Sequence, residues 1–294
     1  MGCIIICDTA ADTLIKYNIK NENVKKLKLK AGEQHFGPHS LTLHNGKLLV
    51  ANTYNNTASI IDCDKFIEMD NIYIGPYPTD IRYYYDKFYV VCGDGDCVVQ
   101  YDIMKKNIEF EIPVGSFPHN MEIDFNRKRG FISNIGENTI SVLDCIKNGV
   151  IKTIKLKNVP VKSETSEDKK YLYVVVSNLG YGIRGKISII NMQSLQVEKE
   201  VTVGNGPVDI CEDEKRIFIS NLCDNSVSIV NKNTLIEEKR YIIDGMPKSI
   251  LKIDNYLYVA DYLYGKLNII DIRDGNKKVI AIGNEPNDMI FTLS

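Results

Sequence analysis

Residues 118–154 read PHNMEIDFNRKRGFISNIGENTISVLDCIKNGVIKTI, and this stretch contains the pattern that decides the fold. After Pro118 come polar residues and a short apolar stretch. Three further apolar runs follow at 130–134, 140–144 and 150–154, with a polar turn at Glu137–Asn138 between the first two. The runs are short, rich in Val, Ile and Phe, and bounded by Gly, Asn and Asp, which is typical of strands. The stretch therefore predicts four strands.

The same unit recurs along the chain. Seven of the nine prolines follow one another at intervals of 40, 40, 42, 47, 40 and 39 residues: Pro38, Pro78, Pro118, Pro160, Pro207, Pro247 and Pro286. Each proline is followed by comparable runs, for example KLLVAN at 47–52 and ASIID at 58–62, or IFISN at 217–221 and VSIVN at 227–231. Four strands in about 40 residues, with no helical periodicity between them, predict one antiparallel propeller blade per unit, with the proline opening the innermost strand.

The two ends of the chain complement each other. Residues 3–29 contain a second, third and fourth run but no first, whereas 286–292 form a first run that lacks the other three. We therefore predict an all-β fold, a single seven-bladed β-propeller domain over 1–294. Its ring closes when the C-terminal inner strand pairs with the three N-terminal strands, which removes two exposed sheet edges.

These repeats resemble the YVTN-type seven-bladed propeller family, also called YncE-like. The resemblance rests on VAN…NTASIID at 50–62, on SN…ENTISVLD at 133–144, and on the turns PVGSFP at 113–118 and TVGNGP at 202–207. It covers nearly the whole chain. It implies the propeller fold, while the family hosts binding proteins, scaffolds and a few enzymes, so function has to be argued from a site.

Charge and hydropathy exclude several classes of protein. The 294 residues carry 36 Lys and Arg against 38 Asp and Glu, a net charge of −2, which argues against a broad nucleic-acid-binding surface. No apolar run approaches the roughly 20 residues of a membrane helix. The N-terminus MGCIIICD lacks the basic region of a secretory signal. We expect a cytoplasmic protein with reduced cysteines that binds neither nucleic acid nor membrane.

Two local motifs are ambiguous. Cys92 and Cys97 flank a GDGD turn at 93–96, which fits a cross-strand thiol pair, half a metal site, or simply two small apolar residues beside a hairpin; we favour the last. GYGIRG at 180–185 matches a dinucleotide-binding motif, but a strand-like run follows it where that motif requires a helix. We therefore expect no nucleotide site there.

The inner strands predict a polar channel. The second position after each proline is polar in all seven units: Ser40, Asp80, Asn120, Lys162, Asp209, Ser249 and Asp288. The next position is mostly apolar, so strand alternation points the polar set toward the channel. One step deeper lie Thr42, Arg82, Glu122, Glu164, Cys211, Leu251 and Ile290, and the position directly after proline adds His39, Thr79, His119 and Lys248. The turns between strands four and one, and between strands two and three, share the face at which this channel begins.

This channel could carry chemistry in two ways. Asp80, Asp209 and Asp288 could hold a divalent cation through oxygen ligands, with Glu122 and Glu164 below them. His39 or His119 beside a carboxylate could act as a general base. The fourth unit departs from the repeat in its inner strand and in its enlarged two-to-three turn, and we expect Tyr181 and Arg184 of that turn to cover part of the channel mouth and contact a ligand.

Two functions remain open. The first, which we favour, is a non-enzymatic binding or scaffold protein that takes a protein partner or small molecule at the channel mouth through Asp80, Arg82, Asn120, Lys162, Tyr181, Arg184, Asp209, Lys248 and Asp288. The second is a channel enzyme, a lactonase-like hydrolase or a lyase, using a carboxylate-bound divalent metal. Tyr54, Tyr262 and Tyr264 lie in turns of the same face and favour contact with a partner.

Overall fold

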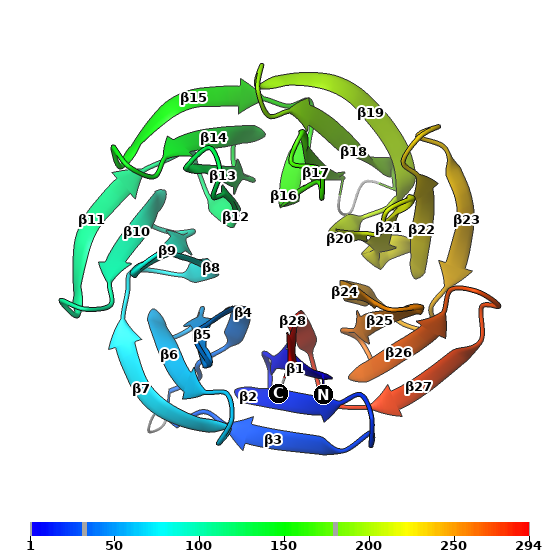
Figure 1. Cartoon of the computed structure of the whole chain (residues 1–294), viewed down its shortest axis with the longest axis horizontal. Coiled ribbons are helices and arrows are strands. Elements are labelled where there is room, and N and C mark those ends of the chain that lie inside the picture. The colour runs from blue at the N-terminus through cyan, green and yellow to red at the C-terminus, as the bar shows by residue number, and fades with distance from the viewer. Residues whose placement is uncertain (1, 31–33, 179–181, 294) are drawn as a thin grey trace.

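The computed structural model describes residues 2–30, 34–178 and 182–293. Twenty-eight strands form seven four-stranded antiparallel sheets, which stand as blades around a common axis (Figure 1). The helical structure among the described residues is one 3-10 turn, Leu222–Asp224, and none of it is long and apolar enough to cross a membrane. The prediction of an all-β seven-bladed propeller is confirmed.

Six blades are continuous in sequence and are numbered here in chain order, with strands running from the channel outward. Blade 1 is β4 (Pro38–His44), β5 (Lys47–Asn52), β6 (Thr57–Asp62) and β7 (Ile67–Tyr73); blade 2 is β8 (Pro78–Tyr84), β9 (Lys87–Cys92), β10 (Cys97–Asp102) and β11 (Asn107–Pro113); blade 3 is β12 (Pro118–Asp124), β13 (Arg129–Asn134), β14 (Thr139–Asp144) and β15 (Gly149–Lys155). Blade 4 is β16 (Val159–Thr165), β17 (Tyr171–Ser177), β18 (Arg184–Asn191) and β19 (Gln196–Asn205); blade 5 is β20 (Pro207–Glu212), β21 (Arg216–Asn221), β22 (Ser226–Asn231) and β23 (Glu237–Ile242); blade 6 is β24 (Pro247–Ile253), β25 (Tyr256–Asp261), β26 (Lys266–Asp271) and β27 (Lys277–Ala281).

Blade 7 joins the two ends of the chain. Its inner strand is β28 (Pro286–Leu293), and the others are β1 (Gly2–Asp8), β2 (Thr13–Asn18) and β3 (Val24–Lys28). β28 pairs antiparallel with β1, with Ile290 opposite Ile5, and the two termini lie close together in Figure 1. The buried carboxylate of Asp8 also accepts the backbone N–H groups of Asn284 (3.1 Å) and Glu285 (2.8 Å). The predicted closure is therefore present.

The core lies between the blades. The buried apolar residues form seven clusters, one at each interface between neighbouring blades. Between blades 1 and 2, for example, Leu49 and Ala58 pack with Phe88 and Val90. The middle strands of each blade bury both faces, which explains why their runs are almost continuously apolar and do not alternate with polar residues.

A buried side-chain ladder accounts for the repeated Asn and Ser of the sequence pattern. In three blades an asparagine that ends the second strand donates from Nδ2 to two hydroxyl groups of the third strand. Asn134, for example, donates to Thr139 Oγ1 and Ser141 Oγ, both at 2.9 Å. Asn52 and Asn221 make the equivalent bonds. These bonds satisfy polar groups that have no access to water, so the motif is structural.

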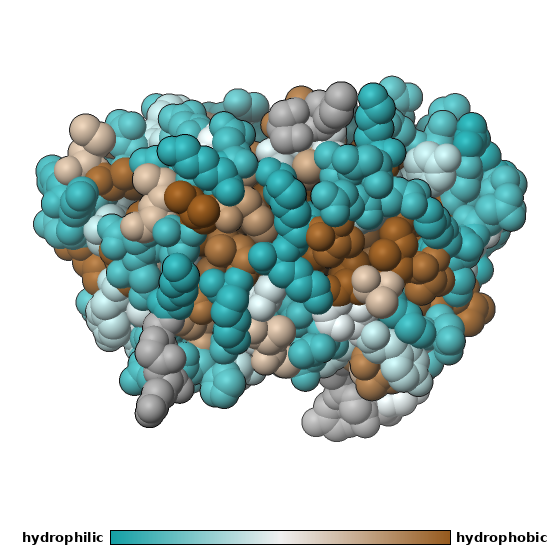
Figure 2. Space-filling model, turned by 90° about the horizontal axis from the view of Figure 1, so that it is seen from below, coloured by the Kyte–Doolittle hydropathy of each residue, from teal (hydrophilic) through white to brown (hydrophobic). Residues whose placement is uncertain are grey.

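The outer strands are largely polar. Figure 2, which views the rim from one side, shows polar side chains over most of the surface and apolar ones visible between them. Exposed Lys25 and Lys26 of β3, with Lys28 at its end, fit protection of a free sheet edge.

Candidate functional site

A bulge shapes the channel end of the inner strands. In blades 1–6 the pairing register shifts directly after the proline, for example between Pro78 and Asp80. A bulge turns neighbouring side chains away from strict alternation. The first and the second residue after proline therefore both line the channel, although alternation alone would send only one of them inward.

These residues enclose a narrow space at the proline end, here called the proline-end cavity. Its volume is about 40 Å³, room for no more than a few water molecules. Its lining is polar for the most part: His39, Ser40, Thr79, Asp80, His119, Asn120, Val161, Lys162, Val208, Asp209, Lys248, Asn287 and Asp288.

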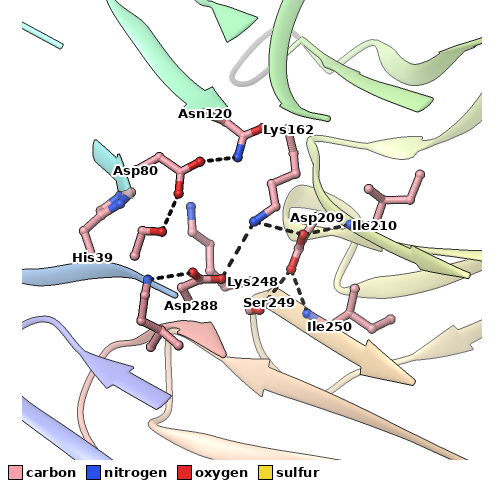
Figure 3. Close-up of polar contacts among 12 residues, drawn as sticks. His39, Asp80, Asn120, Lys162, Asp209, Ile210, Lys248, Ser249, Ile250 and Asp288 are labelled. Carbon is pink, nitrogen blue, oxygen red and sulfur yellow. Dashed lines mark hydrogen bonds and ion pairs between the residues drawn. The ribbon is translucent and has the colours of Figure 1, made fainter. Parts of the chain in front are cut away.

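In blades 2, 3, 5 and 7 the second residue after proline ties its blade to the next one. Asp80 Oδ2 accepts the N–H of Met121 at 2.8 Å, and Asn120 Oδ1 accepts the N–H of Ser163 at 2.8 Å. Asp209 Oδ2 and the N–H of Ile250 repeat this contact at 3.0 Å (Figure 3). In each case the N–H belongs to the third residue after proline in the following blade. The polar ring predicted from the sequence therefore holds the blades together.

Asp80 and Asp209 each accept a second backbone N–H, which belongs to their own strand. Ser40 and Lys162 occupy the ring position before Asp80 and Asp209, and neither accepts the next blade's N–H. Asp80 Oδ1 instead accepts its own neighbour's N–H, that of Ile81, at 2.9 Å, and Asp209 Oδ1 does the same for Ile210. Both oxygens of each carboxylate are therefore occupied by the fold.

Two cations complete the ring. Arg82 lies 2.7 Å from Asp80, and Lys162 lies between Asp209 (3.6 Å) and Asp288 (3.8 Å), as Figure 3 shows for the lysine. Burial lowers the pKa of Lys162, but Asp209 and Asp288 raise it by more, so it stays above its usual value. Burial raises the pKa of Asp288, but Lys162 and Arg82 bring it below its usual value. Lys162 and Asp288 are therefore charged partners of each other at neutral pH.

This donor set does not fit the divalent cation that the sequence suggested. Among the residues that the structure describes, no three His, Cys, Asp or Glu side chains converge closely enough to hold a metal ion. Asp80, Asp209 and Asp288 are turned to backbone N–H groups and to Lys162 and Arg82. A metal would have to displace contacts that join the blades.

The residues directly after proline have spare hydrogen-bonding capacity. His39 Nδ1 lies 2.7 Å from the carbonyl oxygen of Thr79, and His119 Nδ1 lies 3.1 Å from that of Val161. A carbonyl only accepts, so each Nδ1 carries the proton and each Nε2 is left as an acceptor. The two rings meet edge to face, 5.6 Å apart. Burial, helped by the charge of Lys248, lowers the pKa of His39 to about 4, and burial with His39 lowers that of His119 to about 3.

Lys248 is the third such residue. Its side chain points into the ring near Asp288 (Figure 3), but within the described ranges it has no carboxylate within ion-pair distance. Burial and the charge of Lys162 lower the pKa of Lys248. An ammonium group thus faces the proline-end cavity beside two imidazole acceptors.

A larger space, the far-end cavity, lies beyond the ion-pair layer. Its volume is about 450 Å³, and all seven of the deeper positions predicted from the sequence line it: Thr42, Arg82, Glu122, Glu164, Cys211, Leu251 and Ile290. Burial raises the pKa of Glu122 despite Arg82, and burial together with Glu122 raises the pKa of Glu164 well above its usual value. Lys162, Asp209 and Asp288 line both cavities, so these three side chains lie between them.

Of the two predicted loop residues, Arg184 does not join the channel. Arg184 begins β18 and reaches outward to blade 5, where its Nη2 lies 2.8 Å from Glu237 Oε2 and its Nε donates to the carbonyl of Val203. Arg184 lies at the rim because Glu237 provides an ion-pair partner there. The sequence alone does not show that Glu237 lies within reach. Tyr181 lies outside the described residues. Of the turn tyrosines, Tyr54 and Tyr264 are 58% and 54% exposed, whereas Tyr262 is half-buried.

No protein-family model matches the chain. No curated protein sequence matches it either. The YVTN/YncE resemblance is therefore not confirmed at the level of the family.

Solved structures do match. A candidate 6-phosphogluconolactonase from Bacteroides uniformis superposes with a TM-score of 0.80 at 13% identity, over 99% of both chains. Hydrazine synthase of Kuenenia stuttgartiensis gives a TM-score of 0.77 at 18% identity, over 92% of both chains. The WD40 domain of Pan2 from Neurospora crassa gives 0.69 at 10% identity, over 84% of this chain and 79% of that one. At such identities the likeness shows the propeller fold and leaves function to the site.

Proposed function

We propose that this propeller is a non-enzymatic binding protein, and that its partner, a protein or a small molecule, docks on the proline-end face with a polar group in the proline-end cavity. The observation that carries this is the contrast between two sets of side chains. Asp80, Asp209 and Asp288 have their oxygens occupied by the fold. Within the part of the chain that the structure describes, His39, His119 and Lys248 keep unused acceptors and donors at the same mouth.

The cavity limits the chemistry of the group that enters. About 40 Å³ admits one functional group of a larger molecule and no more. Lys248 donates, whereas the two Nε2 atoms accept, so the entering group has to do both. A hydroxyl beside a carboxylate or phosphate satisfies this pattern, as does an acidic peptide with a Ser or Thr.

The surrounding face supports docking of the remainder of such a molecule. Tyr54, Leu263 and Tyr264 are exposed in turns of this face. Exposed aromatic side chains are common energetic centres of interfaces. A similar structure described as a candidate sugar-phosphate lactonase supports including sugar acids among the ligands to test.

Titration calorimetry tests the proposal with three probes: gluconate, 6-phosphogluconate, and a short peptide containing Ser-Asp-Glu. We expect at least one to bind, and Lys248→Met to weaken that binding about tenfold or more, the size of one charged hydrogen bond. Lys252→Met, on the same strand but outside the proline-end cavity, is the matched control and should bind as the wild type does. Binding that Lys248→Met leaves unchanged, or no binding by any probe, would overturn the proposal.

A channel hydrolase of the lactonase type is the second candidate, and one observation favours it. Glu122 and Glu164 line the same 450 Å³ cavity with differently perturbed pKa values, as in carboxyl pairs that divide acid and base roles. Against it, a histidine with a pKa of about 4 is a weak base at neutral pH. Hydrolysis of gluconolactone above the spontaneous rate, lost in Glu164→Gln, would favour this candidate over the first.

Two broader assignments accompany the proposal. The repeat pattern and its buried Asn ladder support placing the chain among YVTN/YncE-like propellers. Seven cysteines, Cys7, Cys63, Cys92, Cys97, Cys145, Cys211 and Cys223, carry free thiols, which supports a reducing compartment such as the cytoplasm.

A further inference from the structure

Two cysteines close the β9–β10 hairpin of blade 2. Cys92 is the last residue of β9, Cys97 is the first of β10, and the two are direct register partners. Directly opposed residues project to the same side of a sheet, and both cysteines pack in the apolar cluster between blades 1 and 2. The Cα atoms of such partners lie about 4.5–5.5 Å apart, inside the range that a disulfide spans.

This arrangement is particular to this pair. Elsewhere the register partner of a cysteine is another residue type, such as Leu14 opposite Cys7 and Phe218 opposite Cys211. Cys223 is exposed on a turn of blade 5. We propose that Cys92 and Cys97 are a redox modification site, a dithiol that a peroxide converts reversibly into a cross-strand disulfide.

The two thiols differ in access and in acidity. Cys97 is half-buried, whereas Cys92 is fully buried. The neighbouring Cys92 thiol lowers the pKa of Cys97, and Cys97 together with burial raises that of Cys92. The thiolate is the nucleophile in thiol chemistry. Cys97 is therefore the attacking residue, and Cys92 is the resolving one.

Glycine at position 95 keeps the turn from crowding the two cysteines. A Cβ placed on Gly95 would lie 3.1 Å from Cys97 Sγ, 3.2 Å from Pro76 Cγ and 3.6 Å from Cys92 Cβ. Any side chain at this position would therefore press on the sulfur that has to react, and glycine avoids that clash.

The chemistry balances with hydrogen peroxide as the oxidant. The Cys97 thiolate attacks one peroxide oxygen, the O–O bond breaks, and hydroxide leaves, which gives the Cys97 sulfenic acid. The Cys92 sulfur then attacks the sulfenic sulfur, the S–O bond breaks, and the thiol proton leaves with the oxygen as water. In sum, two thiols and one hydrogen peroxide give one disulfide and two water molecules, with two electrons passed to the peroxide.

The site lies on the proline-end face. The N–H of Gly93 donates to the carbonyl of Tyr77 at 2.9 Å, and Asp96 Oδ1 accepts the N–H of Phe117 at 2.7 Å. Tyr77 and Phe117 directly precede the prolines that open β8 and β12. A disulfide between Cys92 and Cys97 would thus restrain the end of the β9–β10 hairpin. Gly93 and Asp96 of this hairpin bind the two turns that precede β8 and β12.

Peptide mapping of the full chain tests the inference, in a Cys223→Ser background that removes the exposed thiol. After mild hydrogen peroxide and alkylation without reduction, we expect a species lighter by two hydrogens, with the peptides of Cys92 and Cys97 linked and released by dithiothreitol. Cys97→Ser should block the change. Cys92→Ser should leave a sulfenic acid at Cys97 that dimedone captures.

Two results would overturn the inference. One is a disulfide that joins other cysteines. The other is a chain whose Cys92 and Cys97 stay reduced while other thiols oxidise. Circular dichroism of each variant before oxidation shows whether the propeller is folded, and a Cys145→Ser variant, with its buried thiol removed, should oxidise as the parent does.

Discussion

The carboxylate of Asp288 accepts the backbone N–H of Leu41 at 3.3 Å. The two residues belong to the last and the first inner strand of the chain, yet the bond is the one that Asp80 makes with Met121 and Asp209 with Ile250. The interface that closes the ring is thus built like the interfaces inside it. No special device at the chain ends is needed beyond the pairing of β28 with β1.

Removal of residues 287–294 should open the ring. The deletion takes away most of β28, its pairing with β1 and the Asp288 contacts, and leaves blade 7 without an inner strand. We expect loss of cooperative thermal unfolding and aggregation in size-exclusion chromatography. Deletion of 293–294 alone is the control, since Leu293 is 80% exposed, and it should behave as the full chain does.

Asp209→Ala should be strongly destabilising. The change leaves the N–H of Ile250 and the hydroxyl of Ser249 without their acceptor, and it leaves the ammonium of Lys162 with Asp288 alone. Breaking a buried, hydrogen-bonded ion pair costs about 3–5 kcal/mol. Urea unfolding should show a loss of that order, and Asp209→Asn, which keeps an acceptor oxygen, should lose less. Equal losses for both variants would contradict the structural role of the carboxylate.

Stability should fall in mild acid because of His39 and His119. Their folded pKa values, about 4 and about 3, lie below the unfolded value near 6.5. Between these pKa values the two histidines are protonated in the unfolded chain but not in the folded one. The free energy of unfolding therefore drops as the pH falls from about 6.5 toward 4. Linkage predicts a loss of up to about 3 kcal/mol per histidine over this interval. His119→Gln should flatten the drop in urea unfolding curves, and an unchanged slope would refute it.

Glu164→Gln should stabilise the protein at neutral and basic pH. The pKa of Glu164 is raised in the fold, so its contribution is present below the unfolded pKa and is lost as the pH rises through the folded one. Glutamine removes that loss. We expect a gain of about 1 kcal/mol at pH 8, a usual size for a single-site effect. Exposed Glu214→Gln is the control and should change little. A destabilised Glu164→Gln would show that the carboxylate has a partner.

The fold could be read from the sequence because its signal is local and repeated. The period of the prolines and the Val- and Ile-rich runs between them depend on strand geometry alone. The incomplete units at residues 3–29 and 286–292 then determine how the ring closes. All seven deeper channel positions also lie where alternation predicts them.

The use of the channel residues could not be read in the same way. Asp80 and Asp209 look like metal ligands by type, but their oxygens are taken by N–H groups of residues some 40 positions away or next to them. The residue types in a sequence do not show which backbone N–H groups a carboxylate will accept. The bulge that brings His39 and Lys248 beside the ring is also set by pairing geometry and not by any residue type.

Arg184 is a second case in which the sequence did not predict the contacts of a side chain. The irregular fourth unit drew attention to it, but its partners, Glu237 and the carbonyl of Val203, lie on outer strands. A break in a repeat marks a place where the chain differs and does not say which way a side chain turns. Lys248, within a regular unit, proved to be the basic side chain without an ion-pair partner at the mouth among the described residues.

The ion-pair layer of Lys162, Asp209 and Asp288 affects how a solute could move through the central channel. These side chains border both the proline-end cavity and the far-end cavity. They therefore divide the channel into two separate spaces. These three side chains would have to move apart before a solute could pass from one space to the other. A charged group in either space would also act on Lys162, because this lysine lines both.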